Sequence, residues 1–506
     1  MCSYLHQSLG LMAAHVGIDL GTTLSGLAYL KADGTPEIVP NCDGERLTPS
    51  VVYFEQKESV KLVGTPARNG GDPERTVFQI KRHMDDPDYS VEFDGHRWTP
   101  SEISALILSK LKQDCSRIIG AIKDVIITVP ANYNELARKS TIAAAEMAGM
   151  NVTRLVNEPT AAALYYAYRH HSRGRVLVFD LGGGTLDVTI LDIDFNNIRI
   201  ITSEGARHLG GGHIDDLLLE LYSEQYRQHL NTELYTNERQ RRRILQSIED
   251  SKKMLSKLRN IQDTISNSTH GNVAIDLSRE TFETIISRLL TRAVMLVEQT
   301  LDSAKLKPGD IDHVVLVGGS TRIPKVKAVL HKFFGKAPEF CGNVDEAVAL
   351  GAALFARHAA NIQEVCNHSY GTLAYIVNAR TGEEGIQNSI VIPKNTPLPC
   401  SFAEIYTTSE ANEQEIHVDI TQGEDSDPRY IDVIGRLTLD VPPGRPAGCE
   451  IKVTFSYDEN QRVRAMVLDR QTGLSKEIAV NYKGKGILTD EELENRGTML
   501  RQLRIE

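Results

Sequence analysis

The sequence predicts an α/β domain built from two similar halves, followed by an all-β sandwich domain. A motif composed of a buried strand, an Asp and a Gly–Thr turn occurs twice, at residues 16–23 and 176–187. Strands and amphipathic helices alternate from about residue 16 to residue 359, which is typical of α/β domains. From residue 370 to residue 480 short alternating runs dominate, with Gly, Pro, Asp and Asn at the turns, which favours a β-sandwich.

Each copy of the repeated motif indicates a phosphate-binding hairpin. The copies are GIDLGTT at residues 17–23 and FDLGGGTLD at residues 179–187. Glycine lets the backbone bend sharply and approach an anion, and successive N–H groups in such a turn form a nest for phosphate. An Asp beside phosphate implies a bridging cation, because the two anions would otherwise repel each other. The pair therefore predicts two lobes that clamp a nucleoside triphosphate.

Helices are expected between the strands of the α/β region. One is predicted over Ser101–Ile119, with an N-terminal cap at residues 99–102 and apolar residues at helical spacing. A second is predicted over Asn134–Gly149, where the glycine provides the C-terminal cap. A third is predicted over Thr236–Leu258, and the Arg241–Arg243 run within it is interpreted as a solvated helix face.

Composition and charge limit the classes of protein to which the chain can belong. Its 506 residues suffice for about two to four domains, and 41% hydrophobic with 24% charged residues is ordinary for a globular protein. A net charge of −11 argues against nucleic acid as a partner. No apolar run approaches the roughly 18–20 residues of a membrane span. The first 14 residues lack the charged region of a signal peptide, and the seven cysteines form no CxxC pair, so a cytoplasmic location with reduced thiols is expected.

A third strand–turn motif, VVLVGGSTRIP at residues 314–324, completes a specific set. Further members are IKR at residues 80–82, NEPTAAA at 157–163, HLGG at 208–211, DEAVALGAA at 345–353 and TQGE at 421–424. From about Val16 to Leu493 the chain resembles the DnaK-type (70-kDa heat-shock) molecular chaperone family. It is similar to a divergent, short, bacterial-like branch (HscC-like) that lacks most of the helical lid. The resemblance is highly specific in the first domain and looser in the β domain.

The resemblance implies an actin-like (ribonuclease H-like, duplicated) ATPase domain at residues 16–360 and a β-sandwich substrate-binding domain at residues 369–486. Residues 361–368 would be the interdomain linker, residues 487–506 the start of a truncated helical lid, and residues 1–15 a disordered N-terminal extension. The implied function is an ATP-dependent chaperone that binds extended apolar peptide segments of unfolded proteins. The implied partners are these clients, a J-domain co-chaperone and a nucleotide exchange factor, with neither nucleic acid nor membrane.

The resemblance also implies ATP or ADP with Mg²⁺ as ligands, allows K⁺ as a further ion, and assigns individual residues. Phosphates would be held by Gly21, Thr22, Thr23, Gly182, Gly183, Gly184, Thr185, Gly210 and Gly211. Hydrated Mg²⁺ would be held by Asp19 and Asp180. The catalytic residues would be Lys81, Glu158, Asp180, Thr185 and Asp187, with Lys81 and Glu158 orienting the attacking water. Adenosine would be contacted by Glu249, Lys252, Lys253 and Ser256 on one side and by Gly318, Gly319, Ser320, Arg322 and Asp345 on the other.

These roles suit the chemistry, because phosphoryl transfer requires positioning and charge stabilisation more than covalent catalysis. Taken alone, Lys81 would be interpreted as a surface lysine; the motif around it favours catalysis. Lys253 replaces an Arg that stacks on adenine in the family, so weaker nucleotide binding is expected. Gly212 and His213 replace an acidic pair, and His213 is expected to be neutral and solvent-facing. Leu24 replaces a residue that is usually aromatic or polar.

The β domain carries the residues expected to bind peptide, namely Tyr406, Ser409, Ile416 and Val418. Ile416, Val418 and Ile420 share one face of a strand. The alternative is that all three belong to the sandwich core, and this is favoured for Ile420. An extended peptide would form backbone hydrogen bonds beside the pockets for its apolar side chains.

Coupling between the domains is expected to be weak. Pro130 and Arg138 match family positions that relay the nucleotide state, and Arg154 and Asn157 match a surface met by J-domain partners. The linker, however, lacks the family's leucines and flanking acids at residues 361–368. We therefore expect it to dock poorly as an extra strand, and ATP to accelerate peptide release less than about tenfold.

Other interpretations remain open at this stage. The chain could be another actin-like ATPase, such as a small-molecule kinase or a filament former, although these lack a C-terminal β-sandwich. It could also be a scaffold that binds nucleotide without turnover, which the complete set of catalytic residues argues against. The short C-terminal region could reflect a natural short branch or a chain that is cut short, and the altered linker favours the branch.

Overall fold

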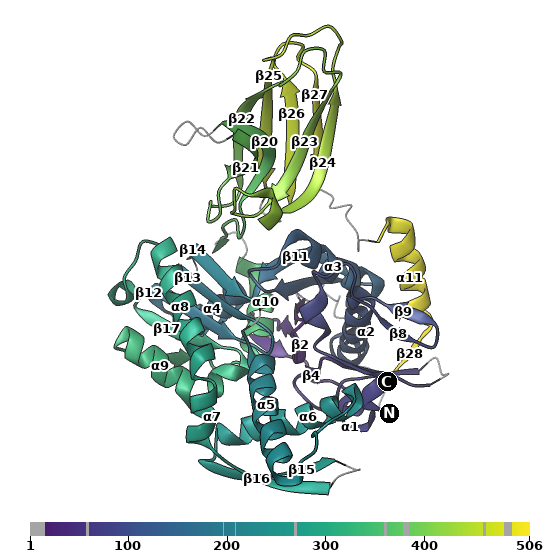
Figure 1. Cartoon of the computed structure of the whole chain (residues 1–506), viewed down its shortest axis with the longest axis vertical. Helices are drawn as coiled ribbons and strands as arrows, with labels where there is room; N and C mark the ends of the chain where they lie inside the picture. The colour runs from purple at the N-terminus through teal and green to yellow at the C-terminus, as the bar shows by residue number, and fades with distance from the viewer. Residues whose placement is uncertain are drawn as a thin grey trace, which may run out of the picture.

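The computed structural model describes residues 16–56, 60–195, 197–207, 209–267, 271–358, 362–377, 384–458, 462–479 and 488–506. The expected extension at residues 1–15 lies outside the described residues. The chain forms a two-lobed α/β domain with a β-sandwich at one end (Figure 1). In the part of the chain that is described, no helix is both long and apolar enough to cross a membrane.

Two sheets of identical topology form the centres of the two lobes. The sheet of lobe I contains β1 (Val16–Asp19), β2 (Leu24–Leu30), β3 (Pro36–Ile38), β10 (Asp124–Val129) and β11 (Asn151–Asn157). The sheet of lobe II contains β12 (Arg173–Leu181), β13 (Leu186–Asp194), β14 (Asn197–Ala206), β17 (His313–Val317) and β18 (Glu339–Phe340). In each sheet the first three strands form an antiparallel meander, and the last two run parallel beside the first. The predicted duplication is confirmed.

Smaller elements decorate both lobes. Lobe I carries β4 (Thr48–Pro49), β5 (Val51–Phe54), β6 (Val60–Val63), β7 (Thr76–Phe78), β8 (Val91–Phe93), β9 (His96–Trp98) and the helices α1 (Thr65–Gly70), α2 (Pro100–Ile119) and α3 (Glu135–Met147). Lobe II carries β15 (Asn260–Asn267), β16 (Gly271–Ser278) and the helices α5 (Gly211–Leu230), α6 (Glu238–Leu255), α7 (Arg279–Ile285), α8 (Ser287–Ser303) and α9 (Pro324–Phe334). The three helices predicted from the sequence are therefore present as α2, α3 and α6. Thr99 and Glu102 form the expected capping box of α2.

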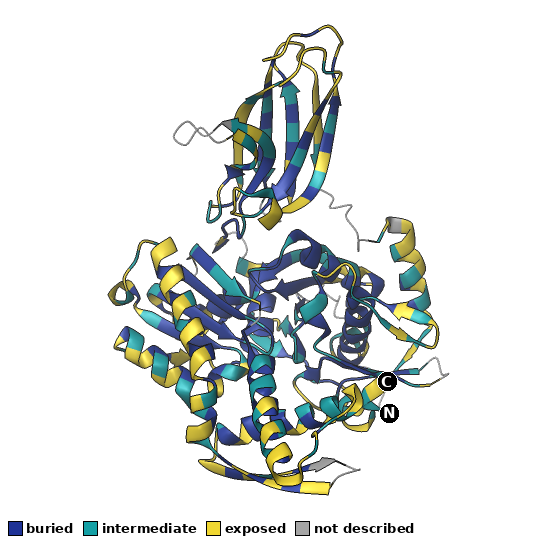
Figure 2. Cartoon of the chain, in the orientation of Figure 1, coloured by how far each residue is buried: buried dark blue, intermediate teal, exposed yellow. Residues whose placement is uncertain are grey.

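Two helices rich in small residues, α4 (Glu158–His170) and α10 (Ala347–His358), pack against each other next to the sheets. A Cβ atom at Gly351 of α10 would lie 1.8 Å from the carbonyl oxygen of Ala161 in α4, so this crossing requires glycine. Buried residues follow the two sheets and these helices, whereas α8 and α9 expose their outer faces (Figure 2). The close packing fixes the ends of β1 and β12, from which the hairpins project.

The β domain is a sandwich of two four-stranded sheets, as predicted. One sheet contains β20 (Tyr370–Val377), β21 (Glu384–Ile392), β23 (Glu415–Gln422) and β24 (Asp432–Asp440). The other contains β22 (Cys400–Thr407), β25 (Glu450–Tyr457), β26 (Val463–Asp469) and β27 (Ser475–Ala479). β20 pairs with β23 only over Tyr370–Thr372, so the rest of the β20–β21 hairpin extends beyond the shared sheet.

The linker docks on lobe II, contrary to the expectation that it would dock poorly. Strand β19 (Ile362–Gln363) pairs parallel with β14 and becomes the sixth strand of that sheet, with Ile362 beside Ile198. Strand addition relies on main-chain hydrogen bonds and therefore tolerates many side chains. Ile362 and Val365 both join the apolar cluster around α4 and α10, so two apolar side chains of the linker take the place of the missing leucines.

The C-terminal segment also differs from the expectation that it would begin a lid over the sandwich. Helix α11 (Asp490–Gln502) lies against lobe I (Figure 1), where a guanidinium nitrogen of Arg496 is 2.9 Å from a carboxylate oxygen of Glu102. Strand β28 (Arg504–Ile505) then pairs parallel with β6. Leu500 is buried in the lobe I core, and this apolar contact explains why the segment packs on lobe I.

Candidate nucleotide-binding site and its link to the β domain

A cavity of about 620 Å³ between the two lobes brings the predicted nucleotide-binding residues together. Its lining includes Asp19, Gly21, Thr22, Thr23, Lys81, Glu158, Asp180, Gly182, Gly183, Thr185, Gly211, Glu249, Lys252, Lys253, Ser256, Gly318, Gly319, Ser320, Arg322 and Asp345. Gly184 and Gly210 are not part of this lining, but they lie next to lining residues in the chain and pack closely against each other. A Cβ at Gly210 would be 2.7 Å from the carbonyl carbon of Gly184. The volume is within the range of small-molecule sites.

The two hairpins approach each other closely across this cavity. A Cβ at Gly183 would lie 2.3 Å from the hydroxyl oxygen of Thr23, so a larger residue would push the lobes apart. In the second hairpin the Gly182 N–H donates to the carbonyl of Thr185 at 3.1 Å, which closes the turn. Only glycine at this point of contact leaves the backbone N–H groups accessible to an anion.

Three Asp side chains concentrate negative charge at one end of the site: Asp19 and Asp180 line the cavity, whereas Asp187 is buried opposite Asp180 on β13, outside the lining. Burial, together with repulsion from Glu158, raises the pKa of Asp19 to about 7 and that of Asp187 to about 7. The same causes, in the same order, raise the pKa of Asp180 well above its usual range. One carboxylate oxygen of Asp187 is buried without a hydrogen-bond partner. This excess of desolvated carboxylate oxygens fits a cation, because oxygen is the ligand that Mg²⁺ prefers.

Lys81 is the ammonium group at the centre of these carboxylates. It lies in a short 3₁₀ turn, Ile80–His83, and forms an ion pair with Glu158. Only 6% of Lys81 is exposed, which excludes the surface-lysine interpretation. The hydroxyl of Tyr133 donates to the Lys81 carbonyl at 2.9 Å and holds the turn in place.

The opposite end of the cavity carries the residues expected to contact adenosine. Lys253 pairs with Glu249 at 2.8 Å, and Arg322 pairs with Asp345 at 2.6 Å. Lys252 is directed instead toward the first turn of α5, where its ammonium nitrogen is 2.7 Å from a carboxylate oxygen of Asp215. Its position therefore supports the phosphate-side turn more directly than the base.

Phe340, at the edge strand β18, is a lining residue that the sequence analysis missed. Its side chain is 40% exposed and shares the cavity with Lys253 and Arg322. The ammonium group of Lys327 lies 5.5 Å from the centre of its ring. Phe340 belongs to none of the recognised motifs, and a single aromatic residue between two motifs gives no signal of its own.

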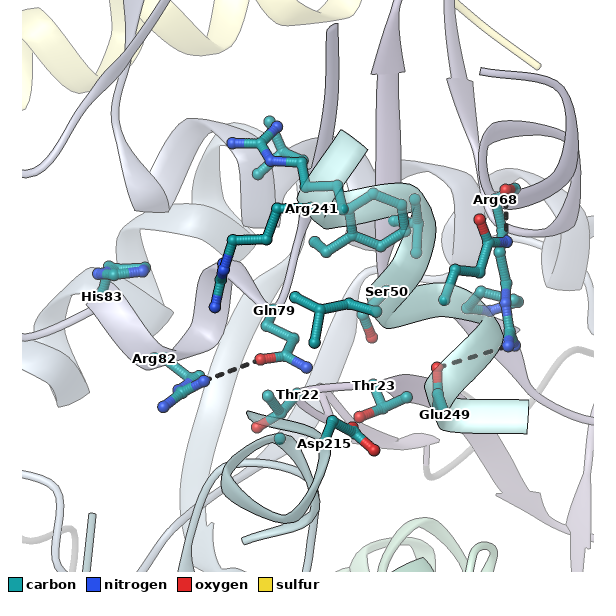
Figure 3. Close-up of a pocket in the computed structure, with 18 of the residues that line it drawn as sticks. Thr22, Thr23, Ser50, Arg68, Gln79, Arg82, His83, Asp215, Arg241 and Glu249 are labelled. Atoms are coloured by element: carbon teal, nitrogen blue, oxygen red, sulfur yellow. Dashed lines mark hydrogen bonds and ion pairs between the residues drawn. The ribbon is translucent and has the colours of Figure 1, made fainter. Parts of the chain in front are cut away.

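A side chamber of about 310 Å³ adjoins the cavity and shares Thr22 and Thr23 with it (Figure 3). Arg82 lines this chamber, and its guanidinium donates at 2.8 Å to Nε2 of His213, which is half-buried rather than solvent-facing. A Cβ at Gly212 would lie 3.1 Å from the side-chain oxygen of Gln79, which binds the same guanidinium. Gly212, which stands in place of an acidic residue of the family, therefore leaves room for the Gln79 and Arg82 side chains next to the hairpins.

The predicted coupling residues meet at the docked linker. The Asn157 side-chain oxygen accepts from the Arg138 guanidinium at 2.8 Å, and its amide nitrogen donates to Glu364 of the linker at 3.1 Å. Asn157 is buried and is therefore not part of an accessible partner surface. Arg154 is half-buried and lies with its guanidinium 5.0 Å from the Phe355 ring.

Pro130 lies in the loop of lobe I that connects β10 to α3. Its carbonyl accepts from the Tyr133 N–H at 3.2 Å, and the Tyr133 carbonyl in turn accepts from His368 at 3.2 Å. Two further contacts join the domains, namely the Glu135 N–H to the Gln422 side chain at 3.2 Å and the Lys394 ammonium to Glu204 at 2.8 Å. Tyr133 thus touches both the Lys81 turn and His368 at the end of the linker.

The residues expected to bind peptide are divided between the sandwich core and its surface. Ile416 and Val418 are buried in the core together with Ile420. Tyr406 is half-buried, and its hydroxyl donates to the Ser389 hydroxyl at 2.9 Å. Ser409 is exposed and pairs with Glu413 in the same loop.

Exposed large apolar side chains concentrate on this domain. Among the described residues, half of the large apolar side chains with high exposure are on the sandwich, although it is less than a quarter of the chain. They are Tyr375, Ile386, Ile390, Phe402, Ile405, Tyr430, Val433 and Leu474. Tyr375 and Ile386 are cross-strand neighbours in the projecting hairpin. Such a concentration is typical of a surface that binds other polypeptides.

Comparison with known proteins agrees with this architecture. A family model described as Hsp70 protein matches residues 15–87 and 84–503. Chaperone protein DnaK of Thermotoga neapolitana is 38% identical over 492 residues, covering 95% of this chain and 82% of the relative. Chaperone protein DnaK of Thermus thermophilus is 36% identical over 518 residues, covering 96% of this chain and 82% of the relative.

Proposed function

The chain belongs to the Hsp70 family and is an ATP-dependent molecular chaperone with ATPase activity, and from this premise we propose which of its residues perform each step. ATP occupies the cavity between the lobes, and its phosphates lie between the two hairpins. The sandwich binds extended apolar segments of unfolded proteins. The observation that carries this proposal is that both hairpins and the Lys81–Glu158 pair line one cavity.

Hydrolysis in this proposal depends on positioning by the chain's own residues. The N–H groups of the glycine turns, with Thr22, Thr23 and Thr185, hold the phosphates. Lys81 stabilises the negative charge that develops on the transferred phosphoryl group. Glu158, held by Lys81, orients the attacking water, and Asp187 accepts a hydrogen bond from that water. Tyr133 keeps the Lys81 turn in register through its hydrogen bond to the Lys81 carbonyl.

Asp19 and Asp180 are the residues we assign to Mg²⁺. No group of three His, Cys, Asp or Glu side chains among the described residues is arranged to hold a metal ion by itself. Mg²⁺ commonly binds through one or two carboxylates together with water and substrate phosphates, so two Asp side chains suffice. When bound, Mg²⁺ neutralises charge on the phosphates and on these desolvated carboxylates.

Peptide binding is assigned to the region around the β20–β21 hairpin. The part of β20 beyond Thr372 pairs only with β21, so its other edge is free to pair with an extended peptide. Tyr375, Ile386 and Tyr406 supply apolar contacts, with Ile416 and Val418 beneath them as core support. We also propose a J-domain co-chaperone and a nucleotide exchange factor as partners.

The proposal is tested by measuring phosphate release from ATP with and without a permanently unfolded protein. We expect slow, Mg²⁺-dependent release of inorganic phosphate, stimulated by the unfolded protein, and competition between that protein and a fluorescent apolar peptide. Transfer of the phosphoryl group to a small-molecule acceptor would instead support a kinase. Nucleotide binding without any release of phosphate would support a scaffold.

A further inference from the structure

We propose that Cys366 and Cys400 form a reversible disulfide that joins the end of the linker to the β-sandwich. Cys366 follows strand β19 closely, and Cys400 begins strand β22. Their sulfur atoms are 4.0 Å apart although 34 positions separate them in the sequence. An S–S bond is about 2 Å long, so the two sulfurs have to approach each other by roughly a further 2 Å for the disulfide to form.

Backbone contacts on both sides of the pair hold the two segments side by side. The Cys366 N–H donates to the Thr396 carbonyl at 2.9 Å, and the Cys366 carbonyl accepts from the Asn395 N–H at 2.8 Å. The Leu398 N–H donates to the Glu364 carbonyl at 2.9 Å. The two thiols are therefore fixed opposite each other by hydrogen bonds that precede and follow them.

This arrangement distinguishes the pair from the other described cysteines. The sulfurs of Cys42, Cys115, Cys341 and Cys449 contact a lysine ammonium, backbone carbonyls or a glutamine side chain. Within the described ranges, only Cys366 and Cys400 have a second sulfur as a close polar neighbour. Packing of a small apolar residue explains the buried Cys115, Cys341 and Cys449, and Cys42 is exposed, but neither situation explains two thiols facing each other.

The two thiols differ in access, which sets the order of reaction. Cys400 is half-buried, and the hydrogen bond from Cys366 lowers the pKa of its thiol. Cys366 is fully buried. With a small disulfide as oxidant, the Cys400 thiolate attacks one sulfur of the reagent, forms a mixed disulfide and releases one thiol. The Cys366 thiolate then attacks the Cys400 sulfur, and the second thiol of the reagent leaves. The protein loses two electrons and two protons, and the oxidant is reduced to two thiols.

The bond would act where the two functional sites meet. It encloses the β20–β21 hairpin, which carries the exposed Tyr375 and Ile386. Cys366, at the linker end of the bond, is two residues from Glu364, whose carboxylate accepts a hydrogen bond from the Asn157 side chain of the ATPase domain. Oxidation therefore ties the hairpin to the docked linker without requiring either nucleotide or peptide.

The test uses the full chain treated with oxidised glutathione and mapped by mass spectrometry without reduction. We expect a cross-linked pair of peptides that contains Cys366 and Cys400, a mass decrease of two hydrogens, and reversal by dithiothreitol. Cys400→Ser should abolish the cross-link, while Cys449→Ser, the matched control in the same domain, should retain it. A lasting glutathione adduct on Cys400, or a cross-link that involves other cysteines, would overturn the proposal.

A second measurement does not depend on how the variants fold. The thermal unfolding midpoint of the wild-type protein should be higher after oxidation than before it, because the bond reduces the number of conformations accessible to the unfolded chain. A lower midpoint for the cross-linked protein would show that the bond strains the native arrangement, and the proposal would then fail as a reversible native disulfide.

Discussion

The nucleotide cavity and the peptide-binding region of the sandwich are built in opposite ways. In the cavity, polar and charged side chains from distant segments converge on one space between the lobes. In the sandwich, two of the four predicted peptide residues, Ile416 and Val418, are core residues, and the exposed apolar side chains belong to positions that no motif marks. The first site depends on exact placement, whereas the second depends on which apolar surface remains uncovered.

If placement governs the cavity, the largest effect in the molecule should come from Lys81→Ala. We expect ATP turnover to fall by about 100- to 1000-fold, because the substitution removes the ammonium that pairs with Glu158 in the cavity lined by Asp19 and Asp180. Affinity for ADP should change little, since the glycine turns remain. Lys110→Ala is the matched control, because Lys110 is also a buried lysine and pairs with Asp114 on α2. Wild-type turnover in Lys81→Ala would show that placement does not govern this site.

If Ile416 and Val418 are core residues of the sandwich, Ile416→Asp should unfold the domain rather than only weaken peptide binding. Ile416 is 8% exposed, and a buried carboxylate that replaces an apolar contact should cost about 3–4 kcal/mol of stability. Ile386→Asp, at a position that is 62% exposed, should leave the thermal unfolding midpoint unchanged.

The same pair of variants decides where peptide binds. Fluorescence anisotropy of a labelled apolar peptide should show weaker binding for Ile386→Asp, in the β20–β21 hairpin, in a fully folded protein. Normal stability together with lost peptide affinity in Ile416→Asp would return Ile416 to the lining of the pocket, as the sequence suggested.

The pKa of Asp187 predicts a stability cost that depends on pH. In the nucleotide-free protein this pKa is about 7, against 3.8 for the model compound. Between these values the folded state binds more protons than the unfolded state, so stability decreases as pH rises from 3.8 to about 7 and levels off at higher pH. About three pKa units at roughly 1.4 kcal/mol each give an upper limit of about 4 kcal/mol at pH 8.

Asp187→Asn removes this cost and should raise the unfolding midpoint of the nucleotide-free protein more at pH 8 than at pH 5. The difference between the two pH values should be about 2 kcal/mol. Asp263→Asn, which changes a carboxylate outside the cavity, is the control. An equal change at both pH values would mean that the Asp187 carboxylate is not destabilised by its surroundings.

The docked linker connects the two regions, and its geometry predicts stronger coupling than the linker sequence suggested. We now expect ATP to accelerate release of a fluorescent peptide by more than about tenfold, or about 1.4 kcal/mol of coupling. Ile362→Asp should remove most of this acceleration, because it places a charge in the apolar cluster beside α4 and α10. Gln363→Asp is a closely matched control, since its side chain is exposed on the same strand. Acceleration below tenfold in the wild type would restore the original expectation.

The sequence predicted those features that depend on particular side chains at the ends of strands. Asp19, Asp180 and the glycine turns could be located because only certain residues permit that backbone and that charge. The docking of β19 and the pairing of β28 with β6 could not be predicted, because main-chain pairing leaves little trace in side-chain identity. The packing of Leu500 on lobe I is similar, since an amphipathic helix does not specify which apolar surface it will meet.

The smallest expected effect is that of Phe340 on ADP affinity. It tests whether the base end of the cavity depends on the position of one aromatic ring or only on an exposed apolar surface. Lys253 cannot stack as a plane, so the exposed Phe340 ring is the aromatic surface in the cavity lining that an adenine base can meet in a stacked arrangement. Phe340→Ala should lower ADP affinity by about 3- to 10-fold, in line with about 0.5–1.5 kcal/mol for an aromatic pair. Binding of tripolyphosphate, which has no base, should not change. Phe195→Ala, at an exposed Phe outside the cavity lining, should alter neither. If Phe340→Ala lost equal affinity for ADP and for tripolyphosphate, Phe340 would act on phosphate binding or on the fold. The adenine base would then be contacted by the residues around Lys253 and Arg322 without the Phe340 ring.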